Sequence, residues 1–267
     1  MGKKAMRYIF ISLKRSILIS SLLVVTMGWA HAQELKPIKL MDPDKKRGLP
    51  VMEALSLRAS VRSWSDKEIS MRDLSDMLWA ANGINRPDGR RTAASATNAQ
   101  DVDVYVFMKE GIYLYDAAGQ VLNPVVSGDY RNKLGMPKWI EAPAGAPGGA
   151  PPGAGAPPKA GAGTPPGAGA PPKAGPGAPS GGETNAPILI FLVSDISRFR
   201  MPPDEVKLQW ASIDTGIVYQ NIALFCAGVG LSARPRALFN EDQVRDFMKL
   251  KGTQHPILNI PVGYAAE

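Results

Sequence analysis

The sequence contains one cysteine, Cys226, and only two histidines, His31 and His255. A single cysteine excludes a disulfide bond within the chain. A zinc site built from cysteine and histidine takes about four such ligands, so zinc sites of that kind are excluded and no metal is predicted. A serine-histidine-aspartate triad would have to use His255, but the sequence contains no nucleophile-elbow motif. These absences leave binding, or chemistry supplied by an organic cofactor.

Acidic residues are absent from positions 1–32, which hold five of the basic residues. The 267-residue chain has 31 Lys and Arg against 24 Asp and Glu, a net charge of +7. Without positions 1–32 the net charge falls to +2. The rest of the chain therefore lacks the basic excess that binds phosphate backbones, and we expect no nucleic-acid partner.

The N-terminal segment has the pattern of a secretory signal peptide. Residues 1–15 are basic, residues 16–29 form an apolar run, and small residues at 30 and 32 precede Gln33. This pattern predicts a signal peptide over 1–32, cleaved near Ala32, and a periplasmic or secreted protein with no stable membrane span after processing. The alternative is an uncleaved membrane anchor, for which the apolar run is short.

Two other segments differ from the rest in composition. Residues 33–50 are polar and rich in proline and lysine, and we expect an extended leader there. Residues 142–184 are mostly Ala, Gly and Pro, and one segment occurs in them twice, at 151–161 and at 165–175. Without large apolar side chains such a segment cannot offset its ordering entropy. We therefore predict a disordered insert at 142–184 within a single domain formed by 51–141 and 185–267.

Hydrophobic periodicity predicts the secondary structure of that domain. Ser70 and Asp73 form a pattern like a capping box at the start of one helix. The helix expected at 205–229 is apolar on nearly all sides, which is typical of a helix buried in a large core or in a subunit interface. The order of elements indicates an α+β fold with one sheet covered by helices. The helices are expected at 51–57, 69–81, 205–229 and 241–251, and the strands at 102–108, 111–119, 188–194 and 256–263.

The first candidate motif is Arg58-Ala59-Ser60-Val61-Arg62. In an extended segment, residues two apart point the same way, so two guanidinium groups and one hydroxyl would share a side. Guanidinium groups match the oxygens of a phosphate. The alternative is a solvated basic face.

Two further segments could carry chemistry. The loop 91–100 has small residues and ends near Asn98 and Gln100, whose amides offer the donors and acceptors that a heteroaromatic ring edge needs. An ordinary polar loop is the alternative. The third candidate segment runs from the predicted helix 214–221 to the predicted turn 234–239. The alternative is that it is a core helix and its turn without a functional role.

Taken in order, these motifs resemble the nitroreductase-like FMN-dependent oxidoreductases, and within them the branch of thiazole/oxazole-forming oxidases of the SagB type. The resemblance covers roughly 51–141 and 185–264. The motifs that carry it are Arg58-x-Ser60-x-Arg62, Leu78-Trp79-Ala80 with Gly83-Ile84, Ser95-x-x-Asn98-x-Gln100, Gly111-Ile112-Tyr113-x-Tyr115, Gln220-Asn221, Gly230-Leu231 and Pro261-x-Gly263.

The resemblance implies a nitroreductase-like fold with a mostly antiparallel sheet, and FMN bound at a homodimer interface that contains the long helix. The N-terminal motif would hold the phosphate, the ribityl chain and the N1 end of the ring. The loop would approach the ring edge from the partner subunit, and the turn would pass flavin N5. The implied cofactor-binding residues are Arg58, Ala59, Ser60, Arg62, Ser95, Asn98, Gln100, Pro235, Ala237 and Leu238.

The predicted function is an exported FMN-dependent oxidoreductase that transfers hydride or electrons through flavin N5 by a ping-pong mechanism. It would act on a small-molecule substrate with an electron donor that the sequence does not identify, and no side chain stands out as catalytic. The alternative is a degenerate, non-catalytic flavin-fold protein that serves as a binding or scaffold module, with the proline-rich segment contacting partners.

Overall fold

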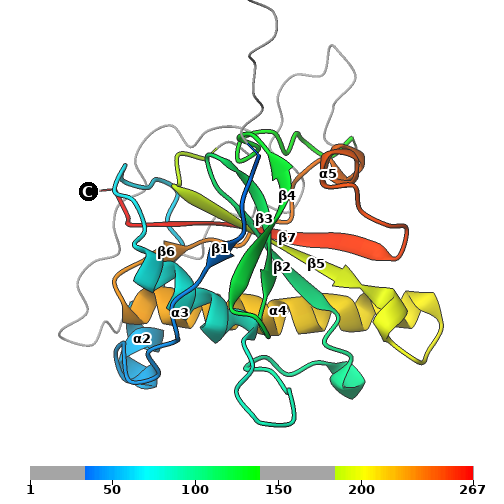
Figure 1. The fold of residues 1–267 in the computed structure, drawn as a ribbon, viewed down its shortest axis with the longest axis horizontal. Coiled ribbons are helices and arrows are strands. Elements are labelled where there is room, and N and C mark those ends of the chain that lie inside the picture. Colours follow the sequence, from blue (N-terminus) through cyan, green and yellow to red (C-terminus); the bar gives the residue numbers. More distant parts are fainter. Residues whose placement is uncertain (1–33, 139–183, 267) are drawn as a thin grey trace, which may run out of the picture. The chain divides into compact units, whose positions relative to one another are not determined.

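The computed structural model of the chain describes residues 34–138 and 184–266. The predicted signal peptide and nearly all of the predicted insert lie outside these residues. The described residues from Leu35 onward belong to one unit, in which a sheet is packed between helices (Figure 1). Within the described ranges, no helix has the length and apolarity of a membrane span.

In the described part of the chain, seven strands form one sheet in the order β1-β4-β3-β2-β5-β7-β6. All neighbouring strands pair antiparallel, which confirms the expected α+β fold with a mostly antiparallel sheet. The strands are β1 (Ile38–Lys39), β2 (Val102–Phe107), β3 (Gly111–Asp116), β4 (Val121–Ser127), β5 (Ile188–Asp195), β6 (Ser232–Ala233) and β7 (Gln254–Gly263).

Two of the helices, α3 and α5, begin at a capping side chain. At the start of α3, the Ser70 hydroxyl accepts a hydrogen bond of 3.0 Å from the backbone N–H of Asp73, which confirms the expected cap. At the start of α5, Asn240 Oδ1 accepts from the N–H of Gln243 at 3.1 Å. The helices are α2 (Val51–Leu57), α3 (Met71–Asn82), α4 (Asp204–Gly228) and α5 (Glu241–Met248), and the short 3-10 turns are η1 (Ala96–Asn98) and η2 (Ile196–Arg198).

The central strands bury side chains on both faces because helices cover both. On β2, Val104 and Val106 belong to the core cluster under α3 and α4. The alternate residues Tyr105 and Phe107 belong to a second cluster that includes Val244 of α5. Figure 1 shows α5 on the opposite side of the sheet from α3 and α4. Strands buried on both faces read as continuous apolar runs, which explains the composition of β5.

The long helix α4 turns one face to the sheet. Its buried residues recur at spacings of three and four, and they include Asp214, Thr215, Val218 and Ile222. Ile213 points away from that core and is 55% exposed. The expected helix is therefore present, and a partner at its outer face remains a prediction.

The segment that precedes α2 joins the sheet. The short strand β1 pairs with β4, so the compact unit begins at Leu35 and includes much of the segment predicted as a leader. Arg47 then forms ion pairs with Asp73 and Asp76 of α3. These contacts fasten the segment 35–50 to the sheet edge and to α3.

The chain that follows the stretch 139–183 is held by residues of the loop that precedes it. The backbone N–H of Thr184 donates to Asn132 Oδ1 at 2.7 Å. Arg131 Nη1 donates to the carbonyl of Pro187 at 2.9 Å, and its guanidinium also pairs with Asp129. We call these contacts the Asn132–Thr184 clamp. They fix the start of β5 directly against the loop that follows β4.

Candidate flavin site

The segment Arg58–Arg62 follows α2 and passes α4. The backbone N–H of Arg58 still bonds to the carbonyl of Ala54 at 2.9 Å, and Arg58 itself has left the helical conformation, with φ −59° and ψ 116°. Arg58 and Ser60 both lie beside the phenol of Tyr219 on α4. Burial raises the pKa of Tyr219, and the adjacent Arg58 guanidinium partly opposes that shift. Arg58 and Ser60 therefore share one side, as the spacing predicts, whereas Arg62, the third residue of the predicted set, lies near Arg234.

Three further guanidinium groups lie near one another, and we call Arg62, Arg234 and Arg236 the arginine row. Burial lowers the pKa of Arg234, and the positive charge of Arg62 lowers it further. Burial and the charge of Arg234 lower the pKa of Arg236 to about 10. These shifts show cations that repel one another.

Two members of the arginine row, Arg62 and Arg234, form no ion pair with a described residue. Among the ion pairs between described residues, none includes Arg58, Arg62 or Arg234. Arg236 is held in place by Asn259, which accepts from Arg236 Nε at 2.7 Å. Mutually repelling guanidinium groups of this kind are stabilised by a bound anion.

The loop Ser95–Gln100 has an unusual backbone. Thr97, Asn98 and Gln100 have φ values of 54°, 55° and 50°, in the left-handed region. Non-glycine residues in that region cost free energy and concentrate at functional sites. Three of them within four positions indicate a loop whose shape is imposed by its surroundings.

Hydrogen bonds hold this strained shape. Ser95 Oγ accepts from the backbone N–H of Gln100 at 2.9 Å, which closes the loop. The Gln100 side chain accepts from Arg91 Nε at 3.0 Å and donates to the carbonyl of Gly89 at 3.2 Å. Asn98 is exposed, and Asn98 Oδ1 lies 3.5 Å from Gln100 Nε2, its side-chain contact among the described residues. Of the predicted loop residues, Ser95 and Gln100 shape the loop, and Asn98 is presented at its surface.

Beneath the loop lie two buried carboxyl groups that the sequence analysis did not single out. The backbone N–H of Ala96 donates to Oδ2 of Asp214 at 2.8 Å. Asp101, fully buried, accepts a hydrogen bond from the hydroxyl of Ser194 on β5. Its carboxyl lies within hydrogen-bonding reach of the carboxyl of Asp214. Burial and the Asp214 charge raise the pKa of Asp101 to about 7.

The turn 235–238 follows β6, contains Arg236 of the arginine row and reaches a pocket at Ala237. Arg236 exchanges two backbone hydrogen bonds with Asn259 of β7, at 2.8 and 2.9 Å. Beyond it, Ala237 and Leu238 are exposed, and their backbone N–H groups donate to no acceptor among the described residues. The turn therefore offers two backbone donors next to a cluster of cations.

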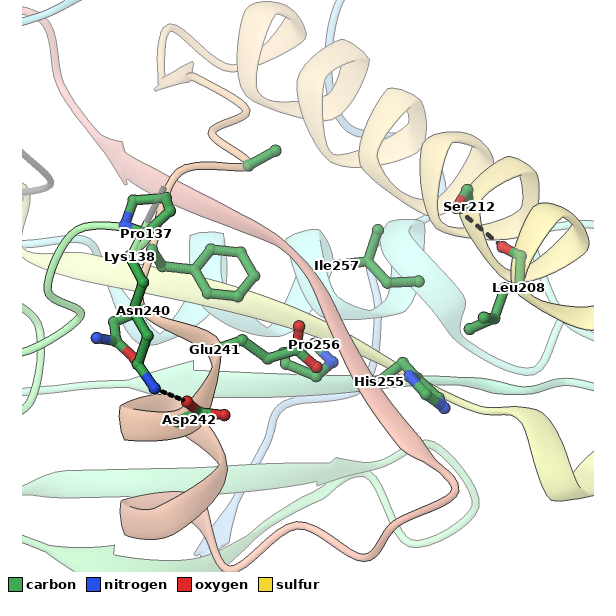
Figure 2. A pocket seen from close by; sticks show the side chains of 12 residues that line it. Pro137, Lys138, Leu208, Ser212, Asn240, Glu241, Asp242, His255, Pro256 and Ile257 are labelled. Atoms are coloured by element: carbon green, nitrogen blue, oxygen red, sulfur yellow. Dashed lines mark hydrogen bonds and ion pairs between the residues drawn. The ribbon is translucent and has the colours of Figure 1, made fainter. Parts of the chain in front are cut away.

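A pocket of about 600 Å³ opens beside Ala237 (Figure 2). Leu208 and Ser212 of α4 lie on one side of it, and Ile257 of β7 faces them across the space. Lys138 and Asp242 form an ion pair at another edge. The other lining residues are Pro137, Phe239, Asn240, Glu241, His255 and Pro256. The volume and the mixed apolar and polar lining are typical of a small-molecule site.

One titratable ring lines this pocket. Burial lowers the pKa of His255, and the positive charge of Arg245 lowers it further. Arg245 Nη2 lies 3.3 Å from His255 Nδ1. Both effects favour the uncharged form of the ring that lines the pocket.

The structure brings some of the predicted residues together and separates others. Arg62 lies near Arg234 and the predicted turn, and Arg58 and Ser60 lie together at Tyr219. The loop contacts α4 at Asp214, which is about 7 Å along the helix and roughly 140° around it from Tyr219. One chain therefore places the loop and the Arg58–Arg62 segment on different faces of α4.

Comparison with known proteins agrees with this architecture. The chain is 20% identical over 231 residues to a candidate nitroreductase of Methanocaldococcus jannaschii, covering 82% of this chain and 96% of that protein. Its fold matches the crystal structure of a candidate nitroreductase from Ralstonia eutropha JMP134 with a TM-score of 0.67 and 26% identity, over 87% of this chain and 91% of that one.

A second solved structure shares the fold. A candidate nitroreductase from Anabaena variabilis matches with a TM-score of 0.60 and 15% identity, over 89% of this chain and 43% of that longer chain. The sequence model of the nitroreductase family matches residues 55–264. The chain therefore belongs to the nitroreductase family, whose members are oxidoreductases that generally use a flavin.

Proposed function

We propose that the chain is an exported FMN-dependent oxidoreductase that acts on a small-molecule substrate, in the branch of the thiazole/oxazole-forming oxidases. The observation that carries the proposal is the arginine row beside two open backbone donors and a pocket. FMN has an anionic phosphate at one end and a ring with acceptor atoms at the other, so its two ends need these two kinds of group.

The residues present fit FMN at its phosphate end. Arg62 and Arg234 have no acid partner among the described residues, and Arg58 and Ser60 extend the same segment. A phosphate placed among these guanidinium groups would relieve their repulsion and accept charge-assisted hydrogen bonds. Ala59 would contribute backbone at this end of the site.

The residues also fit at the ring end. Pro235 has no N–H, so the donors available in the turn are those of Ala237 and Leu238. A backbone donor toward flavin N5 and positive charge near N1 both favour the reduced ring. Bound FMN would supply hydride or electron transfer at N5, with the two half-reactions occurring in sequence at one site. The chain holds the ring, and the pocket beside Ala237 admits the substrate.

A homodimer would complete the site. The outer side of α2 exposes large apolar side chains, and α4 exposes Ile213 and Leu208. Surfaces of this kind are typical of protein interfaces. Because Asn98 and Arg58 lie on different faces of α4, a partner chain that presents its own loop would bring the two together. The exposed apolar residues of α2 are Val51, Met52, Leu55 and Leu57.

The visible absorption spectrum of the purified protein tests the proposal most directly. We expect the spectrum of an oxidised flavin at about one equivalent per chain, after purification or after addition of FMN. Release of the flavin by heat, followed by chromatography, identifies it as FMN. A protein that takes up no flavin at any FMN concentration would contradict the proposal and would favour a non-catalytic binding module built on the same fold.

A further inference from the structure

The carboxyl pair beneath the strained loop has no role in holding FMN directly, and its chemistry is unusual. Both carboxyl groups are buried, with Asp101 at 0% and Asp214 at 2% exposure. Two buried carboxylates in contact repel strongly, whereas one proton between them forms an O–H···O hydrogen bond. The hydrogen bonds around the pair decide between these states.

The donors that reach the pair are few. Asp214 Oδ2 accepts from the N–H of Ala96, and one oxygen of Asp101 accepts from Ser194. The other oxygen, Asp101 Oδ1, is buried and receives no hydrogen bond from any donor among the described residues. A buried acceptor without a donor is costly. A proton shared with the adjacent carboxyl of Asp214 would give the pair a hydrogen bond of its own.

Among the described residues, the cations near the loop bond to groups other than the carboxyl pair. The other charged groups around the loop are Arg91, Asp103, Asp195 and Arg198. Arg198 pairs with Asp103, and Arg91 bonds to the side chain of Gln100. The backbone N–H of Asp195 bonds to the carbonyl of Asp101, and its carboxylate caps η2. The charged group that faces the carboxyl of Asp101 is therefore Asp214.

We propose that Asp101 and Asp214 are positioning residues that share one proton and thereby hold the loop Ser95–Gln100 in the shape that presents Asn98 to the flavin. The inference rests on the proposed flavin site. Asp101 directly follows the loop in sequence, and Asp214 bonds to Ala96 near its start. The shared proton joins the two ends of the loop, and its loss separates them.

A shared proton and simple packing predict different effects of two substitutions at Asp214. In Asp214→Asn, the amide oxygen can accept from Ala96 and the amide nitrogen can donate to Asp101, so the side chain copies a protonated carboxyl. In Asp214→Ala, both hydrogen bonds are lost. We therefore expect Asn to preserve the loop and Ala to release it.

The first measurement is FMN affinity as a function of pH, from the quenching of flavin fluorescence. From about pH 6 to about pH 9 the wild-type affinity should fall about tenfold, while that of Asp214→Asn should change less than about twofold. Asp214→Ala should bind about tenfold more weakly than wild type even at the lower pH. Thr215→Val is the matched control, because Thr215 is equally buried and its hydroxyl has no partner among the described residues.

The second measurement needs no flavin. The infrared spectrum of the wild-type apo-protein near pH 6 should contain the carbonyl stretch of a protonated carboxylic acid, and Asp214→Asn should lack it. If wild type binds FMN with the same pH dependence as Asp214→Asn and lacks that band, Asp101 and Asp214 do not share a proton. If no flavin binds at any pH, the proposed function fails, and the band still decides whether the pair holds a proton.

Discussion

The backbone N–H of Ala96 donates to the carboxyl of Asp214 at 2.8 Å, across 118 positions of sequence. The bond joins the strained loop to the middle of α4. The substitution Ala96→Pro removes this N–H alone. Ser95 before it is extended, with φ −139° and ψ 149°, as a residue that precedes proline prefers. We expect Ala96→Pro to fold and to bind FMN about tenfold more weakly.

Circular dichroism and a fluorescence titration check this prediction. Ala99→Pro is a poor control because its N–H bonds to Ala96 inside η1, so Ala94→Pro, upstream of the loop, is preferred. An Ala96→Pro protein with unchanged FMN affinity would show that the bond to Asp214 does not shape the site.

The arginine row predicts a difference between two flavins. Each charge-assisted contact to a phosphate contributes about 1.5–3 kcal/mol. Arg62→Ala and Arg234→Ala should each weaken FMN binding by about tenfold or more. Riboflavin has the same ring without the phosphate, so its affinity should stay nearly constant. Isothermal titration with both ligands measures the difference.

Arg90→Ala is the matched control for that experiment, because Arg90 is exposed and paired with Asp88. Equal losses of FMN and riboflavin affinity in the arginine variants would place the phosphate elsewhere.

The buried carboxyl of Asp101 predicts how stability depends on pH. In the folded chain its pKa is raised from 3.8 to about 7, by burial and by Asp214. Between these values the folded state holds a proton that the unfolded state has released. The free energy of unfolding therefore falls as pH rises through this window, by up to about 1.4 kcal/mol per pH unit, and levels off above it.

Urea unfolding at a series of pH values tests the sign of this effect. Asp101→Asn carries an amide in place of the acid, so its stability relative to wild type should increase from about pH 4 to about pH 7. Asp88→Asn replaces an exposed acid and is the control. A constant difference between Asp101→Asn and wild type across the window would contradict the prediction.

The pocket beside Ala237 predicts a separation between turnover and cofactor binding. Ser212 lines the pocket and is exposed on α4. Ser212→Trp should fill much of the space, lower kcat/KM by about tenfold or more, and leave the flavin content unchanged. Gln209→Trp places the same side chain on an exposed position of the same helix outside the lining. If both variants reduce an artificial nitroaromatic or quinone acceptor equally well, the substrate does not bind in this pocket.

The exposed side of α2 predicts the assembly. Met52 is 74% exposed, so Met52→Glu removes little from the fold of one chain. In a dimer that buries this side, an unpaired charge would be costly. We expect Met52→Glu to be monomeric and to lose FMN at the same time, as measured by light scattering during size exclusion.

Met201→Glu serves as the control for the assembly, because Met201 has the same exposure of 74% and lies outside α2. A monomeric Met52→Glu protein that retains stoichiometric FMN would show that the site is complete within one chain.

Local patterns were sufficient to predict most of the sheet and all four longer helices. The cap at Ser70, the apolar run of β5 and the β2–β3 hairpin each appear in a short window of sequence. Strand β4 was missed because Pro124 and Asn123 interrupt its apolar residues, and the ladder shifts at this point beside Tyr113. Strand β1 was missed because two residues form no pattern at all.

The site was predictable where its residues are close in sequence. Arg58 and Ser60, two positions apart, both reach Tyr219. Arg234 comes near Arg62 because β6 pairs with β7 and Trp64 pairs with Ala265, and Asp214 comes near Asp101 through the packing of α4 on the sheet. One available signal was Asp214, which is the one charged residue among the buried residues of α4.

The Asn132–Thr184 clamp holds the start of β5 against the loop that follows β4. Because Asn132 and Arg131 fix the backbone at Thr184 and Pro187, the register of β5 is set before the chain enters the strand. Doubling the length of a flexible loop adds only about 0.6 kcal/mol of closure entropy. We therefore expect the start of β5 to keep its pairing when a reporter domain or an affinity peptide is inserted between positions 138 and 184.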